Sequence, residues 1–250
     1  MDVRVSGPGP AAPFLGARDL LLTETDLDRP VRVRIRESPD ERTWTAHYPD
    51  HHVLNISRSA AGSAMARELA LHEFAHMVRY EEDHPSHVFP TDEAISIALA
   101  GQQVERRQVT HCYQIANHMK DIYADDITLS VGPGGKLLDF LEAGLARAVA
   151  DRPVPGPRQA GPVRAGADPE ITAVNAAFAL ALAERHDLIP ANHRLYDLAH
   201  AAAADAPHVA IDPFRRRFRD LDRDLDEDGY RRELVDATRE YVFRSGRVGR

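Results

Sequence analysis

The sequence predicts an α+β protein in which a small N-terminal β-sheet leads into a mostly helical remainder. One observation is the strict alternation in Val31-Arg32-Val33-Arg34-Ile35-Arg36, which gives a strand one apolar and one charged face. The other is a helical periodicity that begins near Ser59 and continues into the C-terminal region. With 250 residues, 43% of them hydrophobic, the chain can bury one substantial core, or one core with a smaller appended unit.

Strands are expected only before Ser59. Residues 1–18 are rich in Gly, Pro and Ala, so we expect an irregular lead-in there. After the alternating strand at 31–36, Ser38-Pro39-Asp40 turns the chain. Two further strands are then expected at 43–48 and 53–57.

The remaining elements are expected to be helices. Ser59 is the expected N-cap of a helix that runs to about residue 80. Asp168-Pro169-Glu170 combines an N-cap, a proline at the first helical position and an acid in the first turn, so another helix begins there. Further helices are expected at about 91–107, 109–129, 137–150, 191–205, 212–222 and 226–244.

A stretch without periodicity divides the helical part of the chain. Residues 151–167 are rich in Pro and Gly, as in a linker or an exposed loop. The sequence therefore predicts an N-terminal domain at 1–150, a linker at 151–167 and a helical C-terminal region at 168–250.

Composition argues against two classes of partner. The formal net charge of −8 argues against general nucleic-acid binding, which needs a basic surface. The basic run Arg215-Arg216-Arg217 is interleaved with aspartates and is expected to form a salt-bridged helix face. No apolar run approaches the roughly 20 residues of a membrane-spanning helix.

The expected location is the cytoplasm. Residues 1–16 lack the continuous apolar region of a secretory signal peptide. The single cysteine, Cys112, cannot form an intramolecular disulfide, which agrees with a reducing compartment.

The most informative stretch is His72-Glu73-Phe74-Ala75-His76. Residues four apart lie one helical turn above each other, so both imidazoles can reach one metal ion. Glu73 lies beside them, where its carboxylate can take a proton from a metal-bound water, as the HExxH pattern requires. Leu71 and Val78 extend an apolar stripe through Phe74 and Ala75, which predicts that this helix packs on a core.

A catalytic zinc site needs a third protein ligand and one open position. The extended metzincin pattern would need glycine and histidine where this chain has Arg79 and Glu82. Glu93 is a candidate, although acids are also favoured in a first helical turn without any function. His84 and His87, in a proline-containing segment after the motif helix, are further candidates.

A helical pair of aspartates one turn apart, Asp121 and Asp125, is the remaining candidate, and His118 lies on the same side of that helix. HEFAH followed by Asp121-Ile122-Tyr123-Ala124-Asp125 resembles the zincin metallopeptidases of the gluzincin type, whose HExxH helix precedes a helix carrying ExxxD. The resemblance covers about residues 53–130. It implies that Asp121, in place of the family glutamate, is the third Zn²⁺ ligand and that Asp125 supports a zinc-bound histidine.

The resemblance also implies a zincin-like helical active-site core and a peptide or protein substrate. The expected protein is a zinc-dependent peptidase in which Glu73 activates the metal-bound water. His118 and Tyr123 are candidate contacts to the oxyanion or the substrate, as are Tyr80 and the two histidines after the motif helix. The strand at 53–57 would pair with extended substrate.

The alternative is a non-catalytic, zinc-stabilised interaction protein on the same scaffold, with the C-terminal helices as its working surface. The sequence leaves the substrate and the oligomeric state open.

Overall fold

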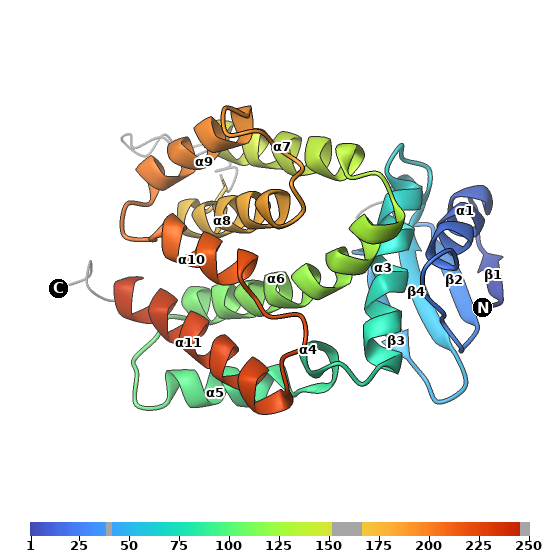
Figure 1. Ribbon diagram of the computed structural model, residues 1–250, viewed down its shortest axis with the longest axis horizontal. Coiled ribbons are helices and arrows are strands. Elements are labelled where there is room, and N and C mark those ends of the chain that lie inside the picture. The colour runs from blue at the N-terminus through green and yellow to red at the C-terminus, as the bar shows by residue number, and fades with distance from the viewer. Residues whose placement is uncertain (39–41, 152–166, 246–250) are drawn as a thin grey trace. The chain divides into compact units, whose positions relative to one another are not determined.

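The computed structural model describes residues 1–38, 42–151 and 167–245. Within them the predicted α+β class is confirmed, with four strands near the N-terminus and helices through the rest of the chain (Figure 1). Two compact units can be distinguished. The first comprises residues 1–89 and 123–136, and the second comprises residues 90–122 and 137–250.

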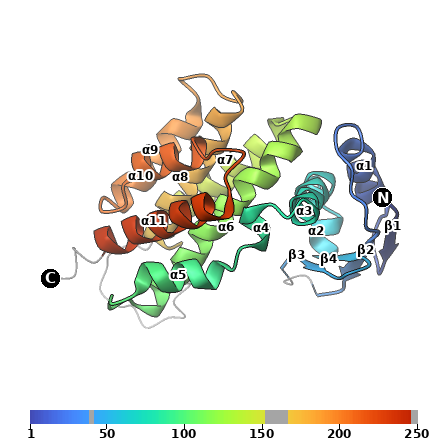
Figure 2. The same ribbon diagram turned by 60° about the horizontal axis from the view of Figure 1, so that its bottom comes forward.

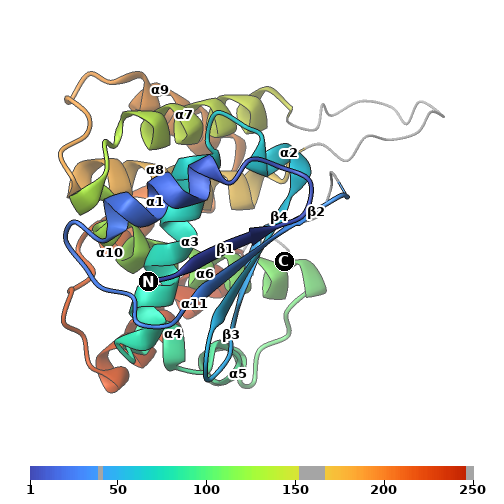
Figure 3. The ribbon, with the colours of Figure 1, turned by 90° about the vertical axis from the view of Figure 1, so that its right-hand side faces the viewer.

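The strands of the first unit form one sheet with the order β1-β2-β4-β3 (Figure 3). The strands are β1 (Val3–Ser6), β2 (Val31–Arg36), β3 (Trp44–His47) and β4 (His52–Ser57). β1, β2 and β4 run parallel, and β3 runs antiparallel to β4. The alternation predicted for β2 is confirmed, because its three apolar residues are buried and its three arginines are exposed.

The expected role of the strand at 53–57 as a substrate-binding edge is wrong. β4 is hydrogen-bonded to β2 on one side and to β3 on the other, so neither of its edges can accept another strand. Among the described strands β3 is the antiparallel edge. The sequence located β4 correctly but carried no information on which strands would flank it.

The lead-in expected at residues 1–18 is also wrong, because it contains β1 and α1 (Ala12–Leu21). A strand of four residues offers only two inward side chains, too few for a local signal, and its parallel pairing with β2 supplies the stabilisation. Gly7 follows β1 with φ of 99°. A Cβ there would lie 2.1 Å from the carbonyl oxygen of Ile35, so the close approach of these strands requires glycine.

The helix expected from Ser59 to residue 80 is two helices, α2 (Arg58–Ala61) and α3 (Ala66–Glu81). The cap is Ser57, whose hydroxyl accepts a hydrogen bond from the Ala60 amide at 3.1 Å. Gly62 ends this short helix as its C-cap residue.

α1 and α3 cover the same face of the sheet (Figure 2). The apolar stripe predicted for α3 is confirmed, because Leu71, Phe74, Ala75 and Val78 are all buried in the core of the first unit. The helix that carries HEFAH is therefore held by packing along its whole length.

Three helices follow α3 in sequence: α4 (Pro85–Val88), α5 (Thr91–Leu99) and α6 (Arg106–Val131). The helix predicted at 91–107 ends early, and Gly101 lies in the break with φ of 74°. α6 includes the helix predicted at 109–129. It is continuous, and its residues from Tyr123 onward belong to the first unit.

The second unit also contains the later helices. They are α7 (Gly135–Ala150), α8 (Pro169–Arg185), α9 (Arg194–Asp205), α10 (Ile211–Arg219) and α11 (Glu227–Ser245). The predicted cap of α8 is confirmed, because the Asp168 carboxylate accepts a hydrogen bond from the Glu170 amide at 2.9 Å. Arg215 and Arg217 of the basic run pair with Glu184 and Glu233 on other helices of this unit.

The boundaries of the compact units differ from those of the predicted domains. Residues 90–122 and 137–150 group with the C-terminal helices, whereas the sequence placed them with the N-terminal sheet. Residues 152–166 of the predicted linker, and Pro39 and Asp40 of the predicted turn, lie outside the described residues. None of the described helices combines the length and the hydropathy of a membrane-spanning segment.

Candidate metal centre

His72 and His76 lie on successive turns of α3 and face each other. Their Nε2 atoms are 3.0 Å apart, and their rings meet edge to face with centroids 4.6 Å apart. The buried neighbours Phe74 and Ala75 anchor this part of the helix, so the two rings project from a rigid backbone.

The other ring nitrogen of His72 is held by α6. The Nδ1 atom of His72 lies 2.7 Å from Oδ1 of Asp125, whose side chain is only 3% exposed. A carboxylate oxygen accepts hydrogen bonds, so Nδ1 of His72 is the donor and Nε2 of the neutral ring keeps its lone pair. Such a carboxylate link fixes the tautomer that a metal-ligating histidine needs.

The other ring nitrogen of His76 is held by α4. The Nδ1 atom of His76 lies 2.7 Å from Nε2 of His87. Both histidines of the motif thus have their outer nitrogen engaged, and their inner nitrogens converge on one point.

Asp121 completes the group. It lies one turn before Asp125 on the continuous helix α6, and one ligand atom from each of His72, His76 and Asp121 lies within 4.8 Å of the others. Among the described residues, this is the one group of three or more His, Cys, Asp or Glu side chains with such spacing. The Nδ1 atom of His118 lies 3.6 Å from Oδ2 of Asp121.

The donor set fits zinc. Two imidazole nitrogens and one carboxylate oxygen are a common catalytic zinc set, in which a fourth position stays open. With Zn–N bonds of about 2.0–2.1 Å, two nitrogens of one tetrahedral ion lie roughly 3.3 Å apart. The observed 3.0 Å between the Nε2 atoms is close to that separation.

Glu73 is half-buried beside the two histidines. Within the described residues its carboxylate has no hydrogen bond or ion pair. A carboxylate without such partners among the described residues can act as a proton acceptor.

The other sequence candidates lie elsewhere. Glu93 is exposed on α5 and does not belong to the metal-ligating group. Tyr123 is fully buried, with its ring centroid 4.5 Å from that of His84, so it offers no surface to a substrate. His118 is 6% exposed, stacks on Phe178 and bonds Asn175 at 2.8 Å, so it lies inside the second unit.

The sequence made His87 a candidate ligand or substrate contact in a loop after the motif helix and gave no sign of Ser86, which is fully buried. The signal that the sequence does contain for the contact between His87 and His76 is the aspartate at position 83. Asp83 follows α3 and has φ of 50°. Aspartate tolerates this left-handed conformation, which reverses the chain and returns α4 to α3.

A second histidine pair ties the sheet to the end of α3. His52 is fully buried, with Nε2 2.9 Å from Glu81 and Nδ1 2.8 Å from Nδ1 of His47. Burial, together with the charge of His52, lowers the pKa of His47 to about 4, so this ring is neutral near pH 7. Burial raises the pKa of Glu81, but hydrogen bonds from the Asp28 amide and from His52 outweigh it and lower the value. Both nitrogens of His52 are bonded inside the protein, so we assign this pair a structural role.

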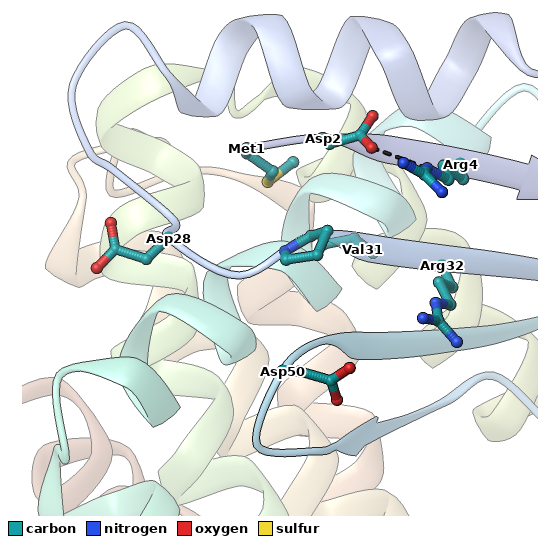
Figure 4. Close-up of a pocket in the computed structure, with 8 residues that line it drawn as sticks. Met1, Asp2, Arg4, Asp28, Val31, Arg32 and Asp50 are labelled. Carbon is teal, nitrogen blue, oxygen red and sulfur yellow. Dashed lines mark hydrogen bonds and ion pairs between the residues drawn. The ribbon is translucent and has the colours of Figure 1, made fainter.

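A pocket in the first unit is separate from these histidines. It lies at the start of β1 and β2 and contains Asp2, Asp28 and Asp50 beside Arg4 and Arg32 (Figure 4). Asp2 and Arg4 pair with each other at 2.8 Å. None of His72, His76 and Asp121 lines this pocket, and its charged residues are of both signs.

A family model described as a family of unknown function, DUF5781, matches residues 1–243. The chain belongs to this family. The match spans both compact units and includes the whole candidate metal centre. No curated protein and no solved structure matches the chain. Function therefore has to be argued from the site itself.

Proposed function

We propose that the protein is a zinc-dependent peptidase of the HExxH type. His72, His76 and Asp121 would hold Zn²⁺, and Asp125 would support His72 from outside the ligand set. The observation that carries the proposal is the convergence of two imidazole nitrogens, 3.0 Å apart, whose outer nitrogens are both hydrogen-bonded. Two neutral rings that face each other with lone pairs repel unless a cation or a proton lies between them.

Zinc, when bound, would polarise a peptide carbonyl and lower the pKa of a coordinated water toward about 7. Glu73 would act as the general base. Its carboxylate, free of partners among the described residues, would accept the proton of the attacking water and pass it to the departing amine. The peptide C–N bond breaks as the new C–O bond forms, so the products are one carboxylate and one amine.

The edge strand supports the same proposal. β3 pairs with β4 through one of its edges and is the antiparallel outer strand of the described sheet. We propose that the other edge of β3 aligns an extended substrate by main-chain hydrogen bonds, the role that the sequence had given to β4.

The number of ligands favours a catalytic over a structural zinc. Structural zinc sites are closed by four protein ligands, whereas catalytic sites use three and leave one position open. The group found among the described residues has three members. We therefore place the peptidase before the zinc-stabilised interaction protein.

The Glu73→Gln variant tests the mechanism. It should bind zinc as the parent does, because Glu73 is not a ligand, and it should lose about 100- to 10,000-fold in hydrolysis. Both proteins, loaded with zinc, would be incubated with a complex peptide pool in ¹⁸O-labelled water, and new labelled C-termini counted by mass spectrometry. Cleavage by Glu73→Gln at the parent rate would eliminate this mechanism.

A further inference from the structure

His76 begins a chain of hydrogen bonds that runs through α4. The Nδ1 atom of His76 lies 2.7 Å from Nε2 of His87, and Nδ1 of His87 lies 2.7 Å from the hydroxyl of Ser86. That hydroxyl in turn lies 2.7 Å from Nδ1 of His84. All these residues belong to the first unit.

The donor and acceptor in each of these hydrogen bonds follow from the tautomer of His76. If Nε2 of His76 binds a metal, the ring must carry its proton on Nδ1 and donate it to Nε2 of His87. His87 must then carry its own proton on Nδ1 and donate it to the Ser86 hydroxyl. The hydroxyl donates to Nδ1 of His84, which also accepts the Ser86 amide at 3.2 Å. Each donor therefore meets an acceptor along the chain.

The backbone around α4 holds these hydrogen-bonded side chains in place. Asp83, with φ of 50°, reverses the chain after α3, and the amide of His84 bonds the carbonyl of Arg79 at 2.9 Å. Pro85 stands at the first position of α4, and the fully buried Ser86 cannot exchange its partners for water. His87 is thus held toward α3.

We propose that His87 is a positioning residue for the metal centre. His87, oriented by Ser86 and His84, holds His76 in the tautomer and ring orientation that metal binding needs. It does for His76 what Asp125 does for His72, with a neutral imidazole in place of a carboxylate. This inference rests on the proposed metal site, and it names a residue that the ligand set does not contain.

The direct test is zinc affinity, measured by competition with a chelator on the full chain. His87→Phe keeps the ring shape but has no acceptor, and it should weaken zinc binding by about 10- to 100-fold. His87→Gln can present a side-chain oxygen to His76 and should restore most of the affinity. His200→Phe, a matched histidine change at an exposed position of α9, should leave zinc affinity unchanged.

A second measurement separates positioning from folding. In the zinc-loaded parent, ¹⁵N-detected histidine spectra should show His87 protonated on Nδ1, and the opposite tautomer would overturn the inference. If His87→Phe does not fold, Ser86→Ala takes its place and should weaken zinc binding several-fold. Equal zinc affinity in the parent and in a folded His87→Phe or Ser86→Ala variant would also overturn it.

These outcomes are distinct from failure of the peptidase. A parent that binds zinc, with Glu73→Gln as active as the parent, would remove the proposed mechanism and leave the role of His87 intact. A parent that binds no zinc would remove both.

Discussion

A half-buried cluster of histidines in the first unit and a buried cluster around Glu170 in the second unit are built in opposite ways. In the second unit Glu170 accepts the Tyr241 hydroxyl at 2.5 Å and pairs with Arg107 at 2.8 Å and His208 at 3.1 Å. His111 lies 3.8 Å from the same carboxylate. In the first unit two imidazole nitrogens point at each other, and the neighbouring Glu73 carboxylate has no partner among the described residues.

The difference suggests a structural role for the cluster around Glu170 and a functional role for His72 and His76. Opposite charges and matched donors close a network around Glu170, which is typical of a structural cluster. The Nε2 atoms of His72 and His76 face each other at 3.0 Å, an arrangement that suits one cation shared by both rings. Perturbing one cluster should therefore leave the other unchanged.

The largest expected effect that separates the clusters is on stability in acid. The ring of His111, with help from the Tyr241 hydroxyl and His208, lowers the pKa of Glu170 to about 2 even though burial raises it. A carboxylate with a lowered folded pKa stabilises the protein above its unfolded pKa, near 4.5, and this contribution is lost as the pH falls toward 2. Acid should thus cost the second unit about 2 kcal/mol over that window.

Two optical signals can assign that loss to a unit. Trp44 is the single tryptophan and lies in the first unit, whereas helical circular dichroism is dominated by the second. In urea titrations between pH 5 and pH 2.5, the circular dichroism transition should move to lower urea more than the Trp44 transition does. Glu170→Gln, which cannot ionise, should lose the part of the pH dependence that Glu170 contributes and should bind zinc normally. If Glu170→Gln instead weakened zinc binding, the separation of the clusters would be wrong.

The next largest expected effect is on zinc affinity, in a variant of the first unit. Asp125→Asn keeps the size of the side chain but presents a weaker, neutral acceptor to His72, so zinc affinity should fall about 10-fold. Stability of the metal-free protein should change little by comparison. The measurement is chelator competition with the metal-free unfolding curve as control, and unchanged zinc affinity would show that the 2.7 Å contact has no role in metal binding.

The sequence predicted what depends on local pattern and failed where distant segments decide. The alternation of β2, the buried stripe of α3 and the Asp168 cap are properties of a few adjacent residues, and all three are confirmed. The existence of β1 and the identity of the strands beside β4 depend on pairing between segments far apart in the sequence. No local pattern predicts such pairing.

The same distinction applies to the candidate site. His72 and His76 share one helix, and Asp121 and Asp125 share another, so helical spacing alone groups each pair. The contact between His87 and His76 depends on the reversal at Asp83, which the periodicity of a helix cannot predict.

Zinc binding by Asp121→Ala, compared with Glu93→Ala, tests the metal centre most directly. The parent should bind one zinc ion per chain. Asp121→Ala should bind it at least 100-fold more weakly, because a ligand is lost, whereas the exposed Glu93→Ala should match the parent. If Asp121→Ala bound zinc as tightly as the parent while Glu93→Ala did not, the ligand assignment would be wrong.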